Sequence, residues 1–202
     1  MDYITTPAII LRSIPFKDHQ KIVTAFSKDL GMISMIIKGL SSKKLFKRPF
    51  CESFCEVELV LTKRQGDLFT FHEGSITNLH LPLRDHLHCL YTASSMVKAI
   101  LESQLPEKPA PLLYALFSTC LHQIPTFLCQ NTLLACFYVK ILKHEGIFSL
   151  SSEERIENSL SEEEKKDLTR ISDVLNFSSL KKINTSLEVL NKLEQFFLMK
   201  IR

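Results

Sequence analysis

The spacing of apolar residues changes near residue 80. Before that point apolar residues occur in short runs with the two-residue period of β-strands, and after it they recur at the three- and four-residue spacing of α-helices. Because the strand-like runs all precede the helical ones, we expect an α+β fold. The expected domains are a strand-rich domain over residues 1–80 and a helical domain over residues 81–202.

The first eighty residues predict five strands, over residues 7–14, 21–26, 32–37, 52–62 and 68–76. The fourth is the clearest, because its odd-numbered residues from Cys55 to Leu61 are apolar, whereas Glu56 and Glu58 between them belong to the exposed face. Gly66 can adopt a positive φ in the hairpin turn that follows. Five short strands favour a small closed barrel, because closure removes exposed edges. The OB-fold is the commonest such barrel, and pleckstrin-like and SH3-like barrels remain alternatives.

The helical pattern predicts helices near residues 111–123 and 130–145, with Gly146 as a C-cap. Two capping boxes, Ser161–Glu164 and Thr185–Glu188, open further helices. The polar span 149–166 is expected to be a loop. Residues 109–139 contain no Asp, Glu, Lys or Arg, but Pro125 divides them into halves too short to span a membrane. We therefore expect two buried helices there and no membrane partner.

Charge is distributed unevenly along the chain. Residues 1–66 contain eleven basic and six acidic residues, whereas the remainder contains fourteen basic and sixteen acidic residues. The overall net charge of +3 therefore combines a basic first third with a slightly acidic rest. This asymmetry indicates a polyanionic partner for the first domain.

Glycine and cysteine usage excludes several kinds of chemistry. No pair among the five glycines has the spacing of a Rossmann, P-loop or α/β-hydrolase turn. None of the six cysteines has C-x-x-C spacing, and the N-terminus shows no signal-peptide pattern. We therefore expect a cytoplasmic protein whose cysteines are buried free thiols.

The best candidate metal ligands are His80, His86, His88 and Cys89. A zinc ion requires four converging nitrogen or sulfur ligands, and on a helix His88 would point away from the face shared by His86 and Cys89. A solvated helix start with one buried cysteine is the favoured interpretation, so we expect no metal, no cofactor and no catalytic residue. A metal-dependent hydrolase using this cluster is retained as an alternative.

A basic loop between the third and fourth strands is the strongest candidate binding feature. Residues 38–48 contain five basic residues and no acid. With basic residues of the neighbouring turns they predict one positive surface, where Lys and Arg would contact phosphates. The candidate nucleic-acid-binding residues are Arg12, Lys17, Lys21, Lys38, Lys43, Lys44, Lys47, Arg48, Lys63 and Arg64.

Aromatic residues accompany this loop. Phe46 lies inside it, and Phe50 and Phe54 follow, so these rings are candidates for stacking against bases. Burial in the barrel core is the favoured interpretation for Phe50, Phe54, Phe69 and Phe71.

The order of these features resembles the RecO family of bacterial recombination mediators. The resemblance is carried by the Ala8–Arg12 strand, Lys21–Phe26, Gly31–Ser34 with Lys38-Gly39, Glu56–Leu59, and the Leu83-Arg84-Asp85 cluster, over about residues 7–146. It implies an OB-fold that binds single- and double-stranded DNA, followed by a helical domain. It also implies a non-enzymatic, nucleoid-associated protein that anneals strands and helps to load RecA together with RecR and the C-terminal tail of single-strand-binding protein.

The sequence departs from the family pattern after residue 146. Many members carry a four-cysteine zinc site there, whereas no cysteine follows Cys136 in this chain. The polar span 149–166 stands in its place. Lys98, Lys140 and Lys143 are candidates for meeting an acidic tail, with solvated lysines as the alternative. A protein-interaction module with an incidental basic loop is the alternative to a DNA-binding function.

Overall fold

The computed structural model describes residues 2–40, 45–63, 66–147, 161–174 and 177–201. The chain forms two compact units, one made of Met1–Leu81 with Gln104–Leu121 and the other of Pro82–Ser103 with His122–Arg202. Residues 104–121 thus group with the strands, although the sequence pattern assigns them to the helical domain. The boundary at residue 80 stays a prediction.

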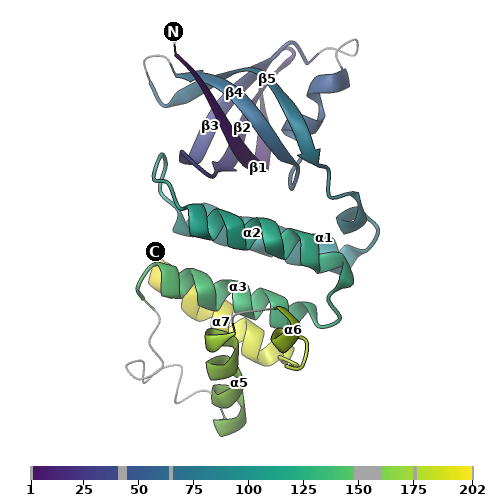
Figure 1. The fold of residues 1–202 in the computed structure, drawn as a ribbon, viewed down its shortest axis with the longest axis vertical. Coiled ribbons are helices and arrows are strands. Elements are labelled where there is room, and N and C mark those ends of the chain that lie inside the picture. Colours follow the sequence, from purple (N-terminus) through teal and green to yellow (C-terminus); the bar gives the residue numbers. More distant parts are fainter. Residues whose placement is uncertain (1, 41–44, 64–65, 148–160, 175–176, 202) are drawn as a thin grey trace. The chain divides into compact units, whose positions relative to one another are not determined.

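Five strands form a closed barrel in the first unit (Figure 1). They are β1 (Tyr3–Lys17), β2 (Gln20–Ser27), β3 (Gly31–Lys38), β4 (Glu56–Lys63) and β5 (Leu68–Asn78). The order around the barrel is β1-β2-β3-β5-β4, with β3 and β5 parallel and the other pairs antiparallel. This order is that of an OB-fold, so the predicted α+β fold with an N-terminal five-stranded barrel is confirmed.

β1 is the strand that closes the barrel. It runs past Pro15, where the sequence pattern ends the strand, and it pairs with β4 through Tyr3–Ile9 and with β2 through Ala8–Lys17. Register shifts after Ile10 and Pro15 mark bulges, which bend a strand and increase its twist. A strand bent in this way can follow the barrel wall from one neighbour to the other.

Alternate residues of the strands fill the barrel. Val57, Leu59 and Leu61 of β4 are essentially unexposed, as the alternation predicts, and they pack with Met35 and Phe69. Burial of such side chains stabilises the fold by roughly 1.5–3 kcal/mol each.

An arm that begins at Gln104 packs on the barrel. Glu107 donates its N–H to the Met32 carbonyl at 2.9 Å, and a Cβ on Gly31 would lie 2.1 Å from the Lys108 carbonyl oxygen. Helix α2 (Pro111–Gln123) follows, and its Tyr114 ring lies 6.1 Å from that of Phe26. Burial, with smaller contributions from the charges of two acidic residues, raises the pKa of Tyr114 to about 12. The lack of a side chain at Gly31 thus permits the close approach of this arm.

Two short 3-10 helices, η1 (Leu45–Lys47) and η2 (Pro49–Cys51), lie between β3 and β4 in the first unit. The second unit contains α1 (Leu87–Ser103), η4 (Ile124–Thr126), α3 (Gln130–His144), α5 (Glu162–Asp173), α6 (Phe177–Leu180) and α7 (Leu187–Ile201), and η3 (Leu81–Arg84) precedes α1. Helix α3 contacts α1, α5 and α7, and all its residues from Thr132 to Val139 are buried. Because it is enclosed by three neighbours, α3 forms the centre of this unit.

The predicted helices near 111–123 and 130–145 are confirmed by α2 and α3, which η4 separates at Pro125. None of the helices in the described part of the chain has the length and apolar character needed to cross a bilayer.

The predicted loop over residues 149–166 is wrong at its C-terminal end, because α5 begins at Glu162. Ser161 forms the predicted capping box with Glu164, and this box starts the helix inside the polar span. Residues 148–160 lie outside the described residues.

The predicted capping box at Thr185 is also wrong. The Ser186 hydroxyl accepts the N–H of Val189 at 3.2 Å, so the start of α7 is capped one residue later than expected. The hydroxyl of Thr185 is buried and has no hydrogen-bond partner among the described residues.

Candidate nucleic-acid interface

Strand register brings three of the predicted lysines to one end of the barrel. Gln20 pairs with Lys17 on one side and with Lys38 on the other, and Lys21 follows Gln20 opposite Ile37. Leu40 donates its N–H to the His19 carbonyl at 2.9 Å, which fastens the chain after β3 to the β1–β2 turn. Lysines from three strands therefore lie within one strand-end region.

The segment after β3 adds two more basic residues to this region. Lys47 donates from Nζ to the Lys38 carbonyl at 3.0 Å, and Arg48 follows it with an exposed side chain. The Ser13 hydroxyl donates to the Cys51 carbonyl at 2.8 Å, and η2 contacts β1 and β2. We refer to Lys17, Lys21, Lys38, Lys47 and Arg48 as the basic end of the barrel.

The pKa of the Cys51 thiol is affected by the charges of the basic end. Burial raises the pKa of Cys51, and the positive charge of Lys21 opposes that rise. Glu52 and Asp18 are also present in this region and are exposed. The basic end thus keeps an excess of positive charge over these two acids.

Two exposed aromatic rings accompany the basic end. Phe46 is 67% exposed, and Phe16 is 48% exposed with the Lys17 Nζ 5.4 Å from its ring centre. The expected burial of the other phenylalanines, Phe50, Phe54, Phe69 and Phe71, is confirmed. Only Phe46 of the predicted stacking rings therefore remains available to a ligand. The sequence pattern does not predict Phe16 as a stacking ring, because it ends the first strand before Pro15.

The other predicted basic residues lie elsewhere or outside the described residues. Arg12 is exposed midway along β1, opposite Thr24. Lys63 lies at the end of β4 and forms an ion pair with Glu107, which adjoins Met32 at the start of β3. The start of β3 is opposite to the end that carries Lys38, so Lys63 is separate from the basic end. Lys43, Lys44 and Arg64 lie outside the described residues, and the role of all ten residues stays a prediction.

A buried polar cluster lies in the same unit. Glu56 is buried, contrary to the expected exposed face of β4, and its Oε1 accepts hydrogen bonds from His80 Nε2 at 3.1 Å and from the Ser118 hydroxyl at 2.8 Å. These donors compensate for the loss of water around the carboxylate. Glu56 therefore ties β4 to the chain after β5 and to α2.

The remaining candidate metal ligands belong to the start of α1. The rings of His86 and His88 stack with their centres 5.3 Å apart, and both side chains are exposed. Cys89 is fully buried, and burial raises its pKa. His86 lies before the first residue of α1. The expectation that His88 points away from His86 assumed that both residues lie on the helix, so it does not apply here. None of the six cysteines forms a disulfide, and all except Cys129 are buried, which confirms the expectation of buried thiols for the other five.

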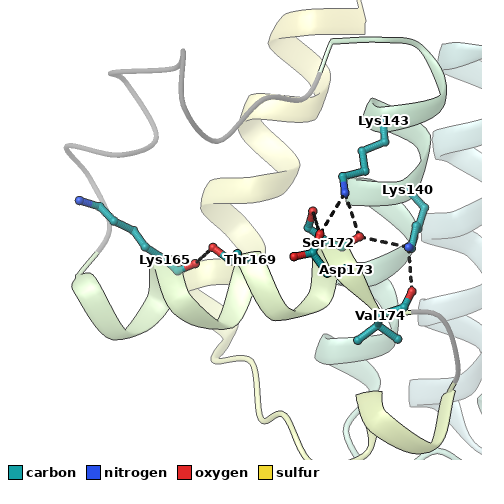
Figure 2. A network of polar contacts seen from close by, with 7 residues as sticks. All are labelled: Lys140, Lys143, Lys165, Thr169, Ser172, Asp173 and Val174. Atoms are coloured by element: carbon teal, nitrogen blue, oxygen red, sulfur yellow. Dashed lines mark hydrogen bonds and ion pairs between the residues drawn. The ribbon is translucent and has the colours of Figure 1, made fainter.

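Lys140 and Lys143, which were candidates for binding an acidic tail, have partners within the second unit. Figure 2 shows both lysines reaching the C-terminus of α5, where they donate to the Ser172 carbonyl at 3.2 and 2.9 Å. Lys140 also donates to the Val174 carbonyl at 2.8 Å, and Lys143 lies 3.5 Å from the Asp173 carboxylate. Lys98 pairs with Glu194 at 3.3 Å. Lys140 and Lys143 stabilise the unit itself, since cations favour helix C-termini.

Comparison with known proteins finds a family model that matches the first eighty residues and relatives that align over most of the chain. The family model described as the recombination protein O N-terminal domain matches residues 1–80. The DNA repair protein RecO of Chlamydia trachomatis serovar L2 (strain 434/Bu) is 30% identical over 151 residues, which cover 73% of this chain and 60% of that protein. The RecO proteins of Clostridium perfringens and Acetivibrio thermocellus are 30% identical over 148 residues and 27% identical over 124 residues.

The alignments cover only part of this chain and only part of each relative. The Clostridium match covers 72% of this chain and 59% of its relative, and the Acetivibrio match covers 61% and 49%. The chain thus spans about 60% or less of the length of these three relatives.

Proposed function

This chain belongs to the RecO family, and on that premise we propose that it binds DNA through the basic end of its barrel and acts in DNA repair by recombination. The proposed mechanism is electrostatic and needs no bond chemistry. Lysine and arginine side chains neutralise phosphates and release their counterions, which drives association without reading the base sequence. Such a protein would act at the bacterial nucleoid.

The observation that carries this proposal is the convergence of positive side chains from β1, β2, β3 and η1. Lys17, Lys38 and Lys47 are tied together by strand pairing and by the Lys47–Lys38 hydrogen bond. Phosphates along a strand are separated by several ångströms, so a group of cations can contact several of them at once. A protein-interaction module would not require this concentration of lysines, none of which has an ion-pair partner among the described residues.

Exposed rings beside the cations support a preference for single strands. Bases that are not paired can stack on aromatic side chains, with a stabilisation of about 1–3 kcal/mol per base. Phe16 and Phe46 are exposed and adjacent in sequence to Lys17 and Lys47. We therefore propose that the protein holds single strands and promotes their annealing.

The wider role proposed for the protein follows from its family. We propose that it acts together with RecR, with the C-terminal tail of single-strand-binding protein and in the loading of RecA. Lys140 and Lys143 both bind the C-terminus of α5, so each would have to leave this partner in order to contact the tail.

The proposal is tested by comparing two triple variants with equal charge change. One carries Lys17→Gln, Lys21→Gln and Lys38→Gln at the basic end. The control carries Lys28→Gln, Lys63→Gln and Lys108→Gln, which are also exposed lysines of the barrel unit. Binding to an oligonucleotide and annealing of complementary oligonucleotides are measured over a range of salt concentrations.

The basic-end variant is expected to lower the slope of log affinity against log salt by about 2–3, because each lost phosphate contact removes roughly 0.7–0.9 from the slope. The control is expected to keep both its slope and its annealing rate. Equal losses in the two variants would show that general charge, rather than the basic end, attracts DNA. Equal losses would also restore the original expectation that Lys63 contributes. Absence of salt-dependent binding in the unchanged protein would favour the protein-interaction module instead.

A further inference from the structure

A groove of about 360 Å³ lies in the second unit, between α5 and the start of α7. Its floor is apolar and consists of Leu168, Ile171 and Val189. Glu163, Glu164 and Asp167 line the α5 side, and the residues on the α7 side are Asn184, Thr185 and Ser186. The groove thus combines an apolar base, an acidic wall and a wall of neutral oxygen-bearing side chains.

The acidic wall is held in place at both ends of α5. At the N-terminus, Glu164 accepts the Ser161 N–H at 2.7 Å and donates its own N–H to the Ser161 hydroxyl. At the C-terminus, the lysines of α3 bind the last carbonyls of the helix (Figure 2). Because α5 is fixed at both ends, the carboxylates are presented without a large ordering cost on binding.

Two carboxylates of this wall can form an ion pair with a ligand. Glu163 is exposed and has no ion-pair partner among the described residues. Asp167 lies one helical turn further on and pairs with Arg170 at 3.1 Å, but Arg170 is 69% exposed. An exposed pair of this kind stabilises a protein by less than about 1 kcal/mol and exchanges readily for a better partner.

Thr185 provides an independent sign that a ligand belongs here. Thr185 lines the groove and is only 5% exposed. Its hydroxyl has no hydrogen-bond partner among the described residues. A buried hydroxyl without a partner costs about 1–3 kcal/mol. The cap of α7 is formed by Ser186, so the Thr185 hydroxyl has no structural role at the helix start. A donor group that reached this hydroxyl from the groove would remove this cost.

We propose that this groove binds an arginine side chain of a partner polypeptide. The methylene stem of an arginine packs on apolar surface while its charged end remains beside polar groups, which matches the floor formed by Leu168 and Val189. The guanidinium has five N–H donors and no acceptor, and it forms strong hydrogen bonds with carboxylates. Glu163, Asp167 and Thr185 offer acceptors on the two walls. An anionic ligand is disfavoured, because three acidic side chains line the same groove.

This site is separate from the proposed DNA-binding function and takes a protein rather than a nucleic acid. The probe is a fluorescein-labelled peptide of leucine, arginine and leucine flanked by glycines, and its binding to the full chain is followed by anisotropy in the absence of DNA. A second peptide with citrulline in place of arginine has the same shape but no charge. We expect the arginine peptide to bind and the citrulline peptide to bind at least fivefold more weakly, about the effect of one exposed charge pair.

Three variants locate the binding. Glu163→Gln with Asp167→Asn is expected to weaken the arginine peptide by about fivefold to tenfold. The matched control, Glu162→Gln with Glu188→Gln, removes two acids that do not line the groove and is expected to bind the peptide normally. Thr185→Val is expected to weaken binding while leaving thermal stability unchanged or higher, because it removes a hydroxyl that has no partner.

Equal affinity for the arginine and citrulline peptides would overturn the proposal. So would equal weakening by the groove variant and its control, since general charge would then explain the binding. A Thr185→Val variant that unfolds at a lower temperature and binds normally would assign the hydroxyl a structural role. Failure of these tests leaves the DNA-binding proposal unaffected, because no measurement includes DNA.

Discussion

Lys47 donates a hydrogen bond from Nζ to the main-chain carbonyl of Lys38, with the two atoms 3.0 Å apart. The two residues lie nine positions apart, on η1 and at the end of β3. The same Nζ lies 5.9 Å from the centre of the Phe71 ring. Lys47 is therefore held by main chain and ring, and its charge is fixed in the basic end.

Replacing Lys47 by methionine keeps the aliphatic stem and removes the charge. We expect the slope of log DNA affinity against log salt to fall by about one, because a single phosphate contact is lost. The hydrogen bond is exposed, so unfolding by urea should change by less than about 1 kcal/mol. Lys28→Met serves as the control, since Lys28 follows the opposite end of β2. A loss of affinity that does not depend on salt would contradict this expectation.

Phe46 is expected to contribute to single-strand binding through stacking. Phe46→Ala should weaken single-strand binding by about 1–3 kcal/mol while leaving the salt slope unchanged, because stacking releases no counterions. Double-strand binding should change little, because paired bases are not free to stack. Phe50→Ala is the contrasting variant: its ring is buried, so it should lower the free energy of unfolding by about 3–5 kcal/mol.

Gly31 and Gly66 test the packing of the Gln104–Leu121 arm. Both have positive φ, 73° and 107°, but only at Gly31 would a Cβ meet another part of the chain. Gly66→Ala should cost about 1–2 kcal/mol of backbone strain alone. Gly31→Ala should cost more and should increase proteolysis near residue 108, because the arm must move from β3. Equal costs, measured by chemical unfolding, would show that the close contact with Lys108 does not matter.

The buried Glu56 should stabilise the barrel unit through the hydrogen bonds that its carboxylate accepts from His80 and Ser118. Glu56→Ala leaves His80 and Ser118 without this acceptor, and we expect a loss of about 3–5 kcal/mol in the free energy of unfolding. Glu56→Gln retains an acceptor oxygen and should cost less. Glu58→Ala is the control on the same strand, because Glu58 is exposed and should change stability by less than about 0.5 kcal/mol.

Cys136 predicts how stability changes at alkaline pH. Burial raises its pKa from 9.0 to about 11, so the folded state keeps the thiol protonated while the unfolded chain loses the proton. The stabilisation is complete below pH 9.0 and is lost as the pH rises towards 11, at about 1.4 kcal/mol per pH unit. Cys136→Ala should be less stable at neutral pH, because it leaves a cavity, but its stability should fall less steeply over this range. Urea unfolding at several pH values measures both effects, and equal slopes in the two proteins would show that another group dominates.

The strands and most helices were predictable because burial imposes local periodicity. Glu56 and Glu58 alternate with the apolar residues Val57 and Leu59, and this alternation located β4 to within a few residues. The burial of Glu56 was not predictable, because its partners His80 and Ser118 lie 24 and 62 positions away. A local pattern contains no information about contacts over such separations.

For the candidate nucleic-acid interface, the sequence predicted which residue types take part but only partly which of them lie on one surface. Lys17, Lys21 and Lys38 were expected on one surface, and strand register explains why they share one strand-end region. Lys63 was expected with them, because its hairpin turn looks equivalent in sequence. The first residue of β5, Leu68, pairs in parallel with Ser34 in the middle of β3, so the turn that precedes Leu68 lies on the side of β3 away from Lys38.

The division of the chain into units has a consequence for its synthesis. Helix α1 belongs to the second unit, yet it lies in the sequence between the strands and the Gln104–Leu121 arm that completes the first unit. The ribosome therefore releases all five strands before the segment that covers Phe26 and Gly31 is made. Neither unit is complete when the other begins to emerge, so the nascent chain must keep exposed strand surface in solution while it is still being extended.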